Sequence, residues 1–342
     1  MLRKLLTATA LTCATCLSTA VLAQEPTAYP GGIWEPGPAE YGVELVENVP
    51  VTMDDGAVLN ASIAYPTDLE TGERAEGPLP VVVEHMPYTR LGAPVTVNTF
   101  FAEHGYISVQ VRVRGLGQSE GEVQFLSPRD GQDGRNIIDW AAHELEGSDG
   151  RVGLIGCSWP GVTAMNDAGY VGPDSPLKAV VAACSGLENM QRQSWIGAGM
   201  PTMSFWSFDA RGADLTGNSE AGTQFFQDMT RDVLAGTDRA FAGGEYWGQR
   251  ATTELAEDIV ANDVPVLLWA GWGDIVETGT MRAYLAFQNA AADRPVFAPM
   301  EPDQPVSPRY QLIMGGWDHA QGLDVGVYLQ WLETWLRGVD TG

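Results

Sequence analysis

The sequence predicts an α/β fold with a mostly parallel sheet, an antiparallel hairpin at its N-terminal side and an inserted helical segment. Three observations lead to this prediction. Apolar runs of strand length alternate with amphipathic stretches over residues 79–186, and again over 263–342. An alternating apolar and polar run precedes them, and residues 187–262 contain no run of comparable strand character. Strands that alternate with helices favour a parallel sheet covered by helices on both faces.

The hairpin is predicted by residues 47–66, ENVPVTMDDGAVLNASIAYP. Apolar and polar residues alternate on both sides of the turn residues Asp54, Asp55 and Gly56. This arrangement is typical of two antiparallel strands joined by a tight turn. We therefore expect an antiparallel pair at one edge of the sheet.

The later elements follow in order along the chain. Six apolar runs read as strands: PVVVEHMPY (80–88), YISVQVRVRG (106–115), RVGLIG (151–156), KAVVAACSG (178–186), VPVLLWAGWGD (264–274) and RYQLIMGGWDH (309–319). Four stretches with apolar residues at helical spacing lie between or after them: TVNTFFAEHG (96–105), RDGQDGRNIIDWAAHEL (129–145), ETGTMRAYLAFQNAA (277–291) and GVYLQWLETWLRG (326–338).

The segment without strands is rich in Trp, Met, Phe and Gly, and we interpret it as a helical cap inserted between two strands of the sheet. The domain organisation that results has five parts: a signal peptide (1–23), an irregular lead-in (24–42), the first part of the α/β domain (43–186), the helical cap (187–262) and the second part of the α/β domain (263–342).

The N-terminus has the features of a secretory signal. MLRKLL supplies a positive start, an apolar stretch follows, and small residues precede a cleavage site after Ala23. The apolar stretch is too short for a membrane span. A lipoprotein signal is the alternative, because Cys13 and Cys16 lie near its end, although the residues before each cysteine do not fit that motif. We expect a secreted or periplasmic protein.

The charge balance excludes some partners. The chain has 44 acidic and 19 basic residues, a net charge of −25. Nucleic-acid phosphates would be repelled by such a surface, so nucleic acid is not an expected partner. An acidic substrate is also disfavoured unless a local basic pocket exists. The apolar content of 44% indicates a globular protein with a substantial core.

Two cysteines, Cys157 and Cys184, follow the cleavage site. Both lie at the ends of predicted neighbouring strands, so a disulfide is conceivable in an exported protein. A cross-link beside residue 158 would stiffen the turn there. Two buried free thiols are therefore the default expectation.

GLIGCSWPGV (153–162) places Ser158 between a predicted strand and a predicted helix. A sharp turn at this point would project the serine at the edge of the sheet and aim the first N–H groups of the helix at the same place. Gly156 is suitably small, and Pro160 is compatible with a helix start. The N–H of Trp159 is then an expected oxyanion donor. The alternative is an ordinary loop in which the serine caps a helix.

The remaining residues favour a nucleophile. In α/β-hydrolases the catalytic residues occur in the order Ser, acid, His. His319 is the one histidine after Ser158, and it follows the last predicted strand. Asp274 ends the preceding strand and is the expected acid. Asp318 and Glu277 are the alternatives, but Asp318 is adjacent to His319 and would not easily reach the far ring nitrogen.

Five stretches occur in a familiar order: HMPYTR, YISVQVRVRGLGQSEGE, GLIGCSWPGVTAM, LLWAGWGD and GGWDH. Together they resemble the peptidase S15-like α/β-hydrolases, which include X-Pro dipeptidyl-peptidase, bacterial cocaine esterase, α-amino-acid ester hydrolase and glutaryl acylase. That family has the motif G-x-S-Y-x-G around its nucleophile. Gly156, Ser158 and Gly161 match it, with Trp159 in place of the usual tyrosine. The resemblance covers roughly residues 43–342.

The resemblance implies further residue roles. Tyr88, in the PY pair after the strand at 80–88, would supply a second oxyanion donor through its hydroxyl. Arg114 and Ser119 would organise the glycine-rich loop beside the site. The family normally continues into a C-terminal jelly-roll domain, whereas this sequence stops at Gly342, so we expect either a fragment or a minimal version of the family; the cap is also short. Both departures put a direct transfer of substrate from the family in doubt.

The sequence thus predicts a secreted serine hydrolase that cleaves small-molecule esters or amides through an acyl-enzyme. X-Pro dipeptidyl-peptidase and α-amino-acid ester hydrolase activities are the alternatives, and an inactive hydrolase fold used for binding is the alternative of another class. No cofactor and no metal are expected. A homo-oligomer is possible, because Tyr328, Leu329, Trp331, Leu332, Trp335 and Leu336 form a wide apolar stripe on the last helix.

Overall fold

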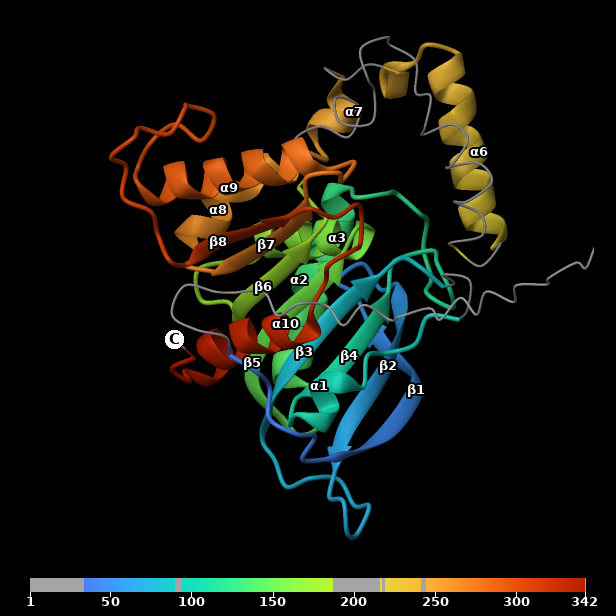
Figure 1. The fold of residues 1–342 in the computed structure, drawn as a ribbon. Coiled ribbons are helices and arrows are strands. Elements are labelled where there is room, and N and C mark those ends of the chain that lie inside the picture. The colour runs from blue at the N-terminus through green and yellow to red at the C-terminus, as the bar shows by residue number, and fades with distance from the viewer. Residues whose placement is uncertain (1–33, 90–93, 187–215, 217–218, 241–243, 342) are drawn as a thin grey trace, which may run out of the picture. The chain divides into compact units, whose positions relative to one another are not determined.

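The structure is a computed structural model, which describes residues 34–89, 94–186, 216, 219–240 and 244–341. Its central element is an eight-stranded sheet with the order β1-β2-β4-β3-β5-β6-β7-β8 (Figure 1). The strands are β1 (Gly42–Thr52), β2 (Val58–Thr67), β3 (Leu79–Met86), β4 (Ile107–Arg112), β5 (Ser148–Cys157), β6 (Leu177–Ala183), β7 (Val266–Gly271) and β8 (Tyr310–Gly315).

The predicted hairpin and parallel sheet are both confirmed. Strand β1 pairs antiparallel with β2, and β2 pairs antiparallel with β4. All the following pairs, from β4–β3 to β7–β8, are parallel. The carboxyl ends of β5, β6, β7 and β8 therefore lie along one edge of the sheet. In parallel α/β sheets, this edge is where ligands and catalytic groups are usually found.

Helices cover both faces of the sheet. The helices are α1 (Phe100–Glu103), α2 (Pro128–His143), α3 (Trp159–Gly169), α6 (Glu220–Leu234), α7 (Glu245–Gly248), α8 (Ala256–Ala261), α9 (Glu277–Ala291) and α10 (Val325–Leu332), with 3₁₀ turns η1 (Asp238–Ala240) and η2 (Thr252–Leu255) and a π-helical turn η3 (Glu333–Arg337). In Figure 1, α1 and α10 lie in front of the sheet, and α2 and α3 lie behind it.

Strand β5 shows how the alternation of side chains builds the two layers. Val152 and Leu154 belong to the large apolar core, which also contains Ile138 of α2 and Met165 of α3. Gly153 points to the other face, where an added Cβ would lie 2.7 Å from Leu332. A residue larger than glycine would therefore require the Leu332 and Leu336 side chains to shift.

The last helix buries most of its apolar stripe within this chain. Tyr328, Leu329, Trp331, Leu332 and Leu336 are all buried. The stripe thus does not provide the exposed apolar surface on which the expectation of self-association depended. Self-association stays a prediction, and this helix provides no argument for it.

The cap boundaries stay a prediction. The described residues between β6 and β7 contain α6, η1, α7, η2 and α8, which agrees with a helical segment there. Much of the cap and the whole signal segment, 1–23, lie outside the described residues. Across the part of the chain that the structure describes, no helix has the length and apolar character needed to cross a membrane.

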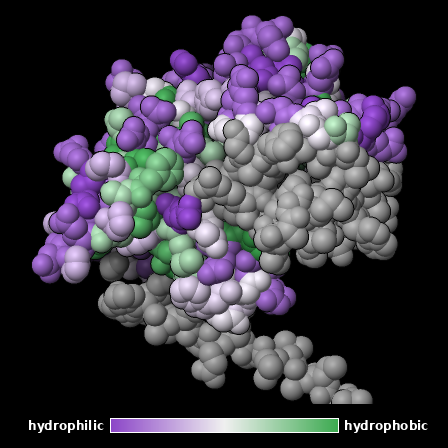
Figure 2. Space-filling view, turned by 90° about the horizontal axis from the view of Figure 1, so that it is seen from above, coloured by the Kyte–Doolittle hydropathy of each residue, from purple (hydrophilic) through white to green (hydrophobic). Residues whose placement is uncertain are grey.

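The surface agrees with the acidic composition. Seen from above the view of Figure 1, hydrophilic side chains cover most of the coloured surface, with a smaller apolar area between them (Figure 2). Such a surface keeps a chain with a net charge of −25 well hydrated.

Candidate active site

The predicted turn at Ser158 is present. Strand β5 ends at Cys157 and α3 begins at Trp159, so Ser158 alone makes the connection. Its φ of 65° and ψ of −128° are unfavourable for a residue with a side chain. Two backbone hydrogen bonds hold this conformation: the Ser158 N–H donates to Ala183 O at 2.9 Å, and the Val162 N–H donates to Ser158 O at 2.9 Å.

The glycines around Ser158 are required by close backbone contacts. A Cβ on Gly156 would lie 2.3 Å from the carbonyl carbon of Pro160. A Cβ on Gly161 would lie 2.5 Å from the carbonyl oxygen of Ala183. Pro160 occupies the first turn of α3, where its missing N–H has no helical partner to lose. The second glycine of the motif is thus needed at position 161, three residues after Ser158, because the start of α3 contacts the backbone of β6 there.

Ser158, His319 and Asp274 form an unbroken hydrogen-bonded chain. His319 Nε2 lies 2.7 Å from Ser158 Oγ, and His319 Nδ1 lies 2.7 Å from Asp274 Oδ1. A neutral ring that is protonated at Nδ1 donates to the carboxylate and accepts the serine proton at Nε2. Of the candidate acids, Asp274 rather than Asp318 or Glu277 is the one bonded to the ring.

The environment favours an ionised Asp274 and a protonatable His319. Burial acts to raise the pKa of Asp274, but hydrogen bonds from His319 and from the Val276 N–H, at 3.0 Å, outweigh it and leave that pKa lowered. Burial acts to lower the pKa of His319, but the hydrogen bond and charge of Asp274 outweigh it and raise that pKa. The pair is therefore suited to stabilising an imidazolium.

The loops that carry Asp274 and His319 are in direct backbone contact. The Trp272 N–H donates to Gly315 O at 2.8 Å, and the Gly273 N–H donates to Trp317 O at 3.1 Å. A Cβ on Gly271 would lie 1.9 Å from Trp317 O, and one on Gly273 would lie 2.2 Å from Asp318 Oδ1. The glycines of the GWGD and GGWD stretches thus let the two loops meet and set the distance between acid and histidine.

The two expected oxyanion donors meet beside Ser158. The Tyr88 hydroxyl donates to Ser158 Oγ at 3.2 Å, and the Trp159 N–H donates to the Tyr88 hydroxyl oxygen at 3.3 Å. The Tyr88 and Trp159 rings also contact each other edge to face. Burial raises the pKa of Tyr88, so its phenol stays protonated and able to donate.

Arg112, which no motif in the sequence singles out, holds the backbone of Tyr88 in place. Its guanidinium donates to the backbone oxygen of Tyr88 and, at 2.5 Å, to that of Val95. Ser119 Oγ in turn donates to Arg112 O at 2.8 Å. Arg114 makes two bonds of 2.7 Å to the buried Asp133. The expectation that Arg114 and Ser119 organise this loop agrees with these contacts.

Glu84 lies beside Arg112 and accepts a hydrogen bond of 3.1 Å from Gln110 Nε2. Burial raises the pKa of Glu84 to about 7. Glu84 therefore stays protonated in the folded protein at pH values above 4.5, its ordinary pKa, at which it loses the proton in the unfolded chain. The stability from this group is present below pH 4.5 and is lost as the pH rises through about 7.

We expect Glu84→Gln to remove this pH dependence. The amide keeps the acceptor for Gln110 and cannot ionise, so the variant should gain about 2 kcal/mol in unfolding free energy relative to wild type between pH 5 and pH 8. Urea unfolding at the two pH values measures this difference. Glu47→Gln, at an exposed position of β1, controls for the loss of one negative charge. An equal gain in both variants would contradict a specific role of Glu84.

Comparison with known proteins identifies the family of the chain. Residues 55–321 match the X-Pro dipeptidyl-peptidase (S15 family). The chain belongs to this family. No curated protein matches the chain.

Several solved structures share the fold. A CocE/NonD family hydrolase from Staphylococcus aureus is 20% identical, with a TM-score of 0.63, 87% of this chain covered and 51% of that one. An α-amino acid ester hydrolase is 20% identical, with a TM-score of 0.58 and coverage of 90% and 52%. An aminopeptidase from a marine sediment Thaumarchaeota archaeon is 19% identical, with a TM-score of 0.59 and coverage of 94% and 59%. The S15 chain described here thus spans about half the length of the first two structures.

Proposed function

We propose that this S15-family hydrolase is a serine hydrolase that cleaves carboxylic esters or amides through an acyl-enzyme. The observation that carries the proposal is the chain of two 2.7 Å contacts from Ser158 through His319 to Asp274. A serine hydroxyl needs a base within hydrogen-bond reach, and the base needs a group that fixes its tautomer.

In the first half of the reaction, Ser158 Oγ attacks the substrate carbonyl carbon and its proton passes to His319 Nε2. The Asp274 carboxylate holds the ring through Nδ1 and stabilises the imidazolium that forms. Collapse of the tetrahedral intermediate breaks the bond to the leaving group, which takes the proton from Nε2. The product is an ester between Ser158 and the acyl group.

In the second half, water replaces the leaving group. His319 Nε2 accepts a proton from the water, whose oxygen attacks the acyl carbon. The new tetrahedral intermediate expels Ser158 Oγ, which recovers its proton from the imidazolium. The free carboxylic acid leaves, and the residues return to their starting protonation states.

Tyr88 and Trp159 are proposed to stabilise the negative oxygen of both intermediates. With substrate bound, the phenol O–H rotates away from Ser158 Oγ toward the carbonyl oxygen, and the same carbonyl oxygen replaces the Tyr88 hydroxyl oxygen as the acceptor for the Trp159 N–H. Donors that are already in place interact more strongly with an oxyanion than with a neutral carbonyl, which lowers the barrier.

We expect Tyr88→Phe to lower kcat by about 10² to 10³-fold with little change in KM, because one oxyanion donor is lost. Steady-state kinetics on a single ester checks this. Tyr41→Phe removes a phenol hydroxyl ahead of β1 and is the matched control, with kcat unchanged. A Tyr88 variant with the wild-type kcat would reduce this residue to a packing role.

Among substrates, we propose esters first and X-Pro peptides or α-amino-acid esters second. The second class requires a carboxylate that holds the free α-amino group. Glu188 and Asp209 lie outside the described residues, and Glu245 begins α7. No described contact places Glu245 beside Ser158, and simple esters come first because they need no such carboxylate.

The test is a panel of short-chain acyl esters, aminoacyl esters and glycyl-prolyl anilide. Hydrolysis of the acyl esters alone supports the first choice, and a preference for the anilide or the aminoacyl esters supports the second. No turnover of any member, by correctly folded protein, would favour the alternative of an inactive binding fold. The acidic surface disfavours anionic substrates, so neutral esters are the first to assay.

We also propose that the protein is exported. The support is the sequence pattern of residues 1–23, with Arg3 and Lys4 ahead of an apolar stretch and small residues up to Ala23. N-terminal sequencing of the protein recovered from outside the cytoplasm should give a start at Gln24. A start at Met1 would contradict cleavage.

A further inference from the structure

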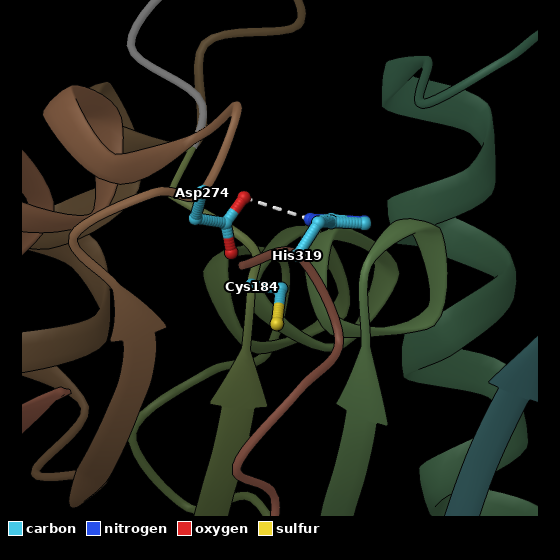
Figure 3. A group of neighbouring side chains, drawn as sticks. All are labelled: Cys184, Asp274 and His319. Atoms are coloured by element: carbon cyan, nitrogen blue, oxygen red, sulfur yellow. Dashed lines mark hydrogen bonds and ion pairs between the residues drawn. The ribbon is translucent and has the colours of Figure 1, made fainter. Parts of the chain in front are cut away.

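A third side chain, Cys184, lies beside the acid and the histidine (Figure 3). The three residues follow three neighbouring strands: Cys184 comes after β6, Asp274 after β7 and His319 after β8. One ligand atom from each residue lies within 4.8 Å of the other two. The hydrolytic mechanism uses Asp274 and His319 but assigns no role to this thiol.

The donor atoms of this cluster are available. Cys184 is a free thiol, and its Sγ accepts a weak contact of 3.3 Å from the Ala320 N–H. The thiol also interacts with the Cys157 side chain and with the Asp274 carboxylate. Asp274 is 6% exposed, and its Oδ2 has no hydrogen-bond partner among the described residues. His319 Nδ1 is the ring nitrogen on the Asp274 side. A buried carboxylate oxygen without a partner is costly unless it meets a proton or a cation.

We propose that Cys184, Asp274 and His319 form a binding site for Zn²⁺, and that the bound ion inhibits the hydrolase. Only the inhibition depends on the proposed function. Thiolate sulfur, imidazole nitrogen and carboxylate oxygen are the ligands that Zn²⁺ takes in proteins. The ion would be an inhibitor and not a cofactor, because it would occupy groups that the reaction needs.

The geometry requires a small contraction. Zinc bonds of about 2.0 to 2.3 Å in a tetrahedral site place the donor atoms roughly 3.3 to 3.8 Å apart. The three donors, no more than 4.8 Å apart, reach this by side-chain rotation. The His319 side chain is 28% exposed, which gives the ion and a water ligand a path from solvent.

Binding changes protonation without changing oxidation state. The Cys184 thiol releases its proton to solvent as the Zn–S bond forms. Zinc takes the lone pair of His319 Nδ1, so the proton of the neutral ring must sit on Nε2. That nitrogen then donates toward Ser158 Oγ and cannot accept the serine proton. The hydrogen bond between His319 and Asp274 is lost in the same step.

Cobalt binding tests the site without any substrate. Metal-free protein titrated with Co²⁺ should show a saturable thiolate-to-cobalt charge-transfer band with one ion per chain, which Zn²⁺ then abolishes. Ca²⁺ and Mg²⁺ should not displace cobalt, because they prefer oxygen ligands. Cys184→Ser should lose the band and bind Zn²⁺ at least about 100-fold more weakly. Cys157→Ser, which removes the other described thiol, is the matched control and should keep the band.

Three results would overturn the proposal: no saturable band in the wild-type protein, a band that survives in Cys184→Ser, or a band that disappears in Cys157→Ser. If Cys184→Ser fails to fold, Asp274→Asn provides the second variant, and it should weaken Zn²⁺ binding by at least about 10-fold while keeping the cobalt–thiolate band. Unchanged Zn²⁺ affinity in that variant would also contradict the site. Metal binding by a protein that hydrolyses nothing would contradict the proposed function and leave the metal site standing.

Discussion

Ser158→Ala should reduce kcat/KM by about 10⁴-fold or more on any substrate that the wild-type protein hydrolyses. Alanine removes the attacking oxygen and leaves only the binding energy of the remaining site. The substitution should not disturb the fold, because the turn accepts a Cβ at this position and the two backbone hydrogen bonds of Ser158 do not involve its side chain.

The control is Ser185→Ala, which removes the hydroxyl of another buried serine, just past the end of β6. This variant should keep most of the wild-type kcat/KM. Thermal unfolding of both variants shows whether the fold is retained. A Ser158 variant that is folded and still active within 10-fold of wild type would mean that another residue is the nucleophile.

Asp274→Asn should lower kcat by about 10⁴-fold. The amide fits the space of the carboxylate, but its NH₂ group can donate to Nδ1 and so favours the tautomer with the proton on Nε2. In that tautomer, His319 cannot accept the serine proton. The amide also lacks the negative charge that stabilises the imidazolium.

Asp318→Asn is the matched control for this prediction. Asp318 is the neighbour of His319 and was the alternative acid in the sequence, so the two substitutions remove the same charge near the same ring. Steady-state kinetics of both variants separates them. A larger loss from Asp318→Asn than from Asp274→Asn would reassign the acid.

The sheet could be predicted because the amino-acid composition of its strands distinguishes them from the rest of the chain. A buried parallel strand such as β7 needs apolar residues on both faces. Its sequence, VLLWAG, is an unbroken run of apolar residues. The hairpin was equally clear, because its strands alternate around an Asp-Asp-Gly turn. The candidate site followed from the order of Ser158, Asp274 and His319 at the ends of strands.

The contacts that complete the site could not be predicted in the same way. Arg112 ends a strand and looks like an ordinary surface residue, yet the folded chain brings it to the backbone of Tyr88. Cys184 and Ala320 both adopt positive φ, of 50° and 57°, and meet across two loops. Such pairs depend on how separate loops approach one another, which periodicity does not encode.

The glycines beside the acid are an intermediate case. A sequence such as GWGD indicates a turn, but it does not explain why residue 271 must be glycine. In the fold, a Cβ on Gly271 would lie 1.9 Å from the carbonyl oxygen of Trp317, in the loop that carries the histidine. The motif was visible in the sequence, and its physical reason became visible only in the fold.

The most direct test of the central claim is labelling of the folded protein with a fluorophosphonate probe, followed by peptide mapping in a mass spectrometer. Such probes react with a serine that an adjacent base activates, and they need no knowledge of the substrate. The proposed mechanism predicts one label per chain, on Ser158, and none in the Ser158→Ala variant. Folded wild-type protein that stays unlabelled, or that carries the label on a different serine, would contradict it.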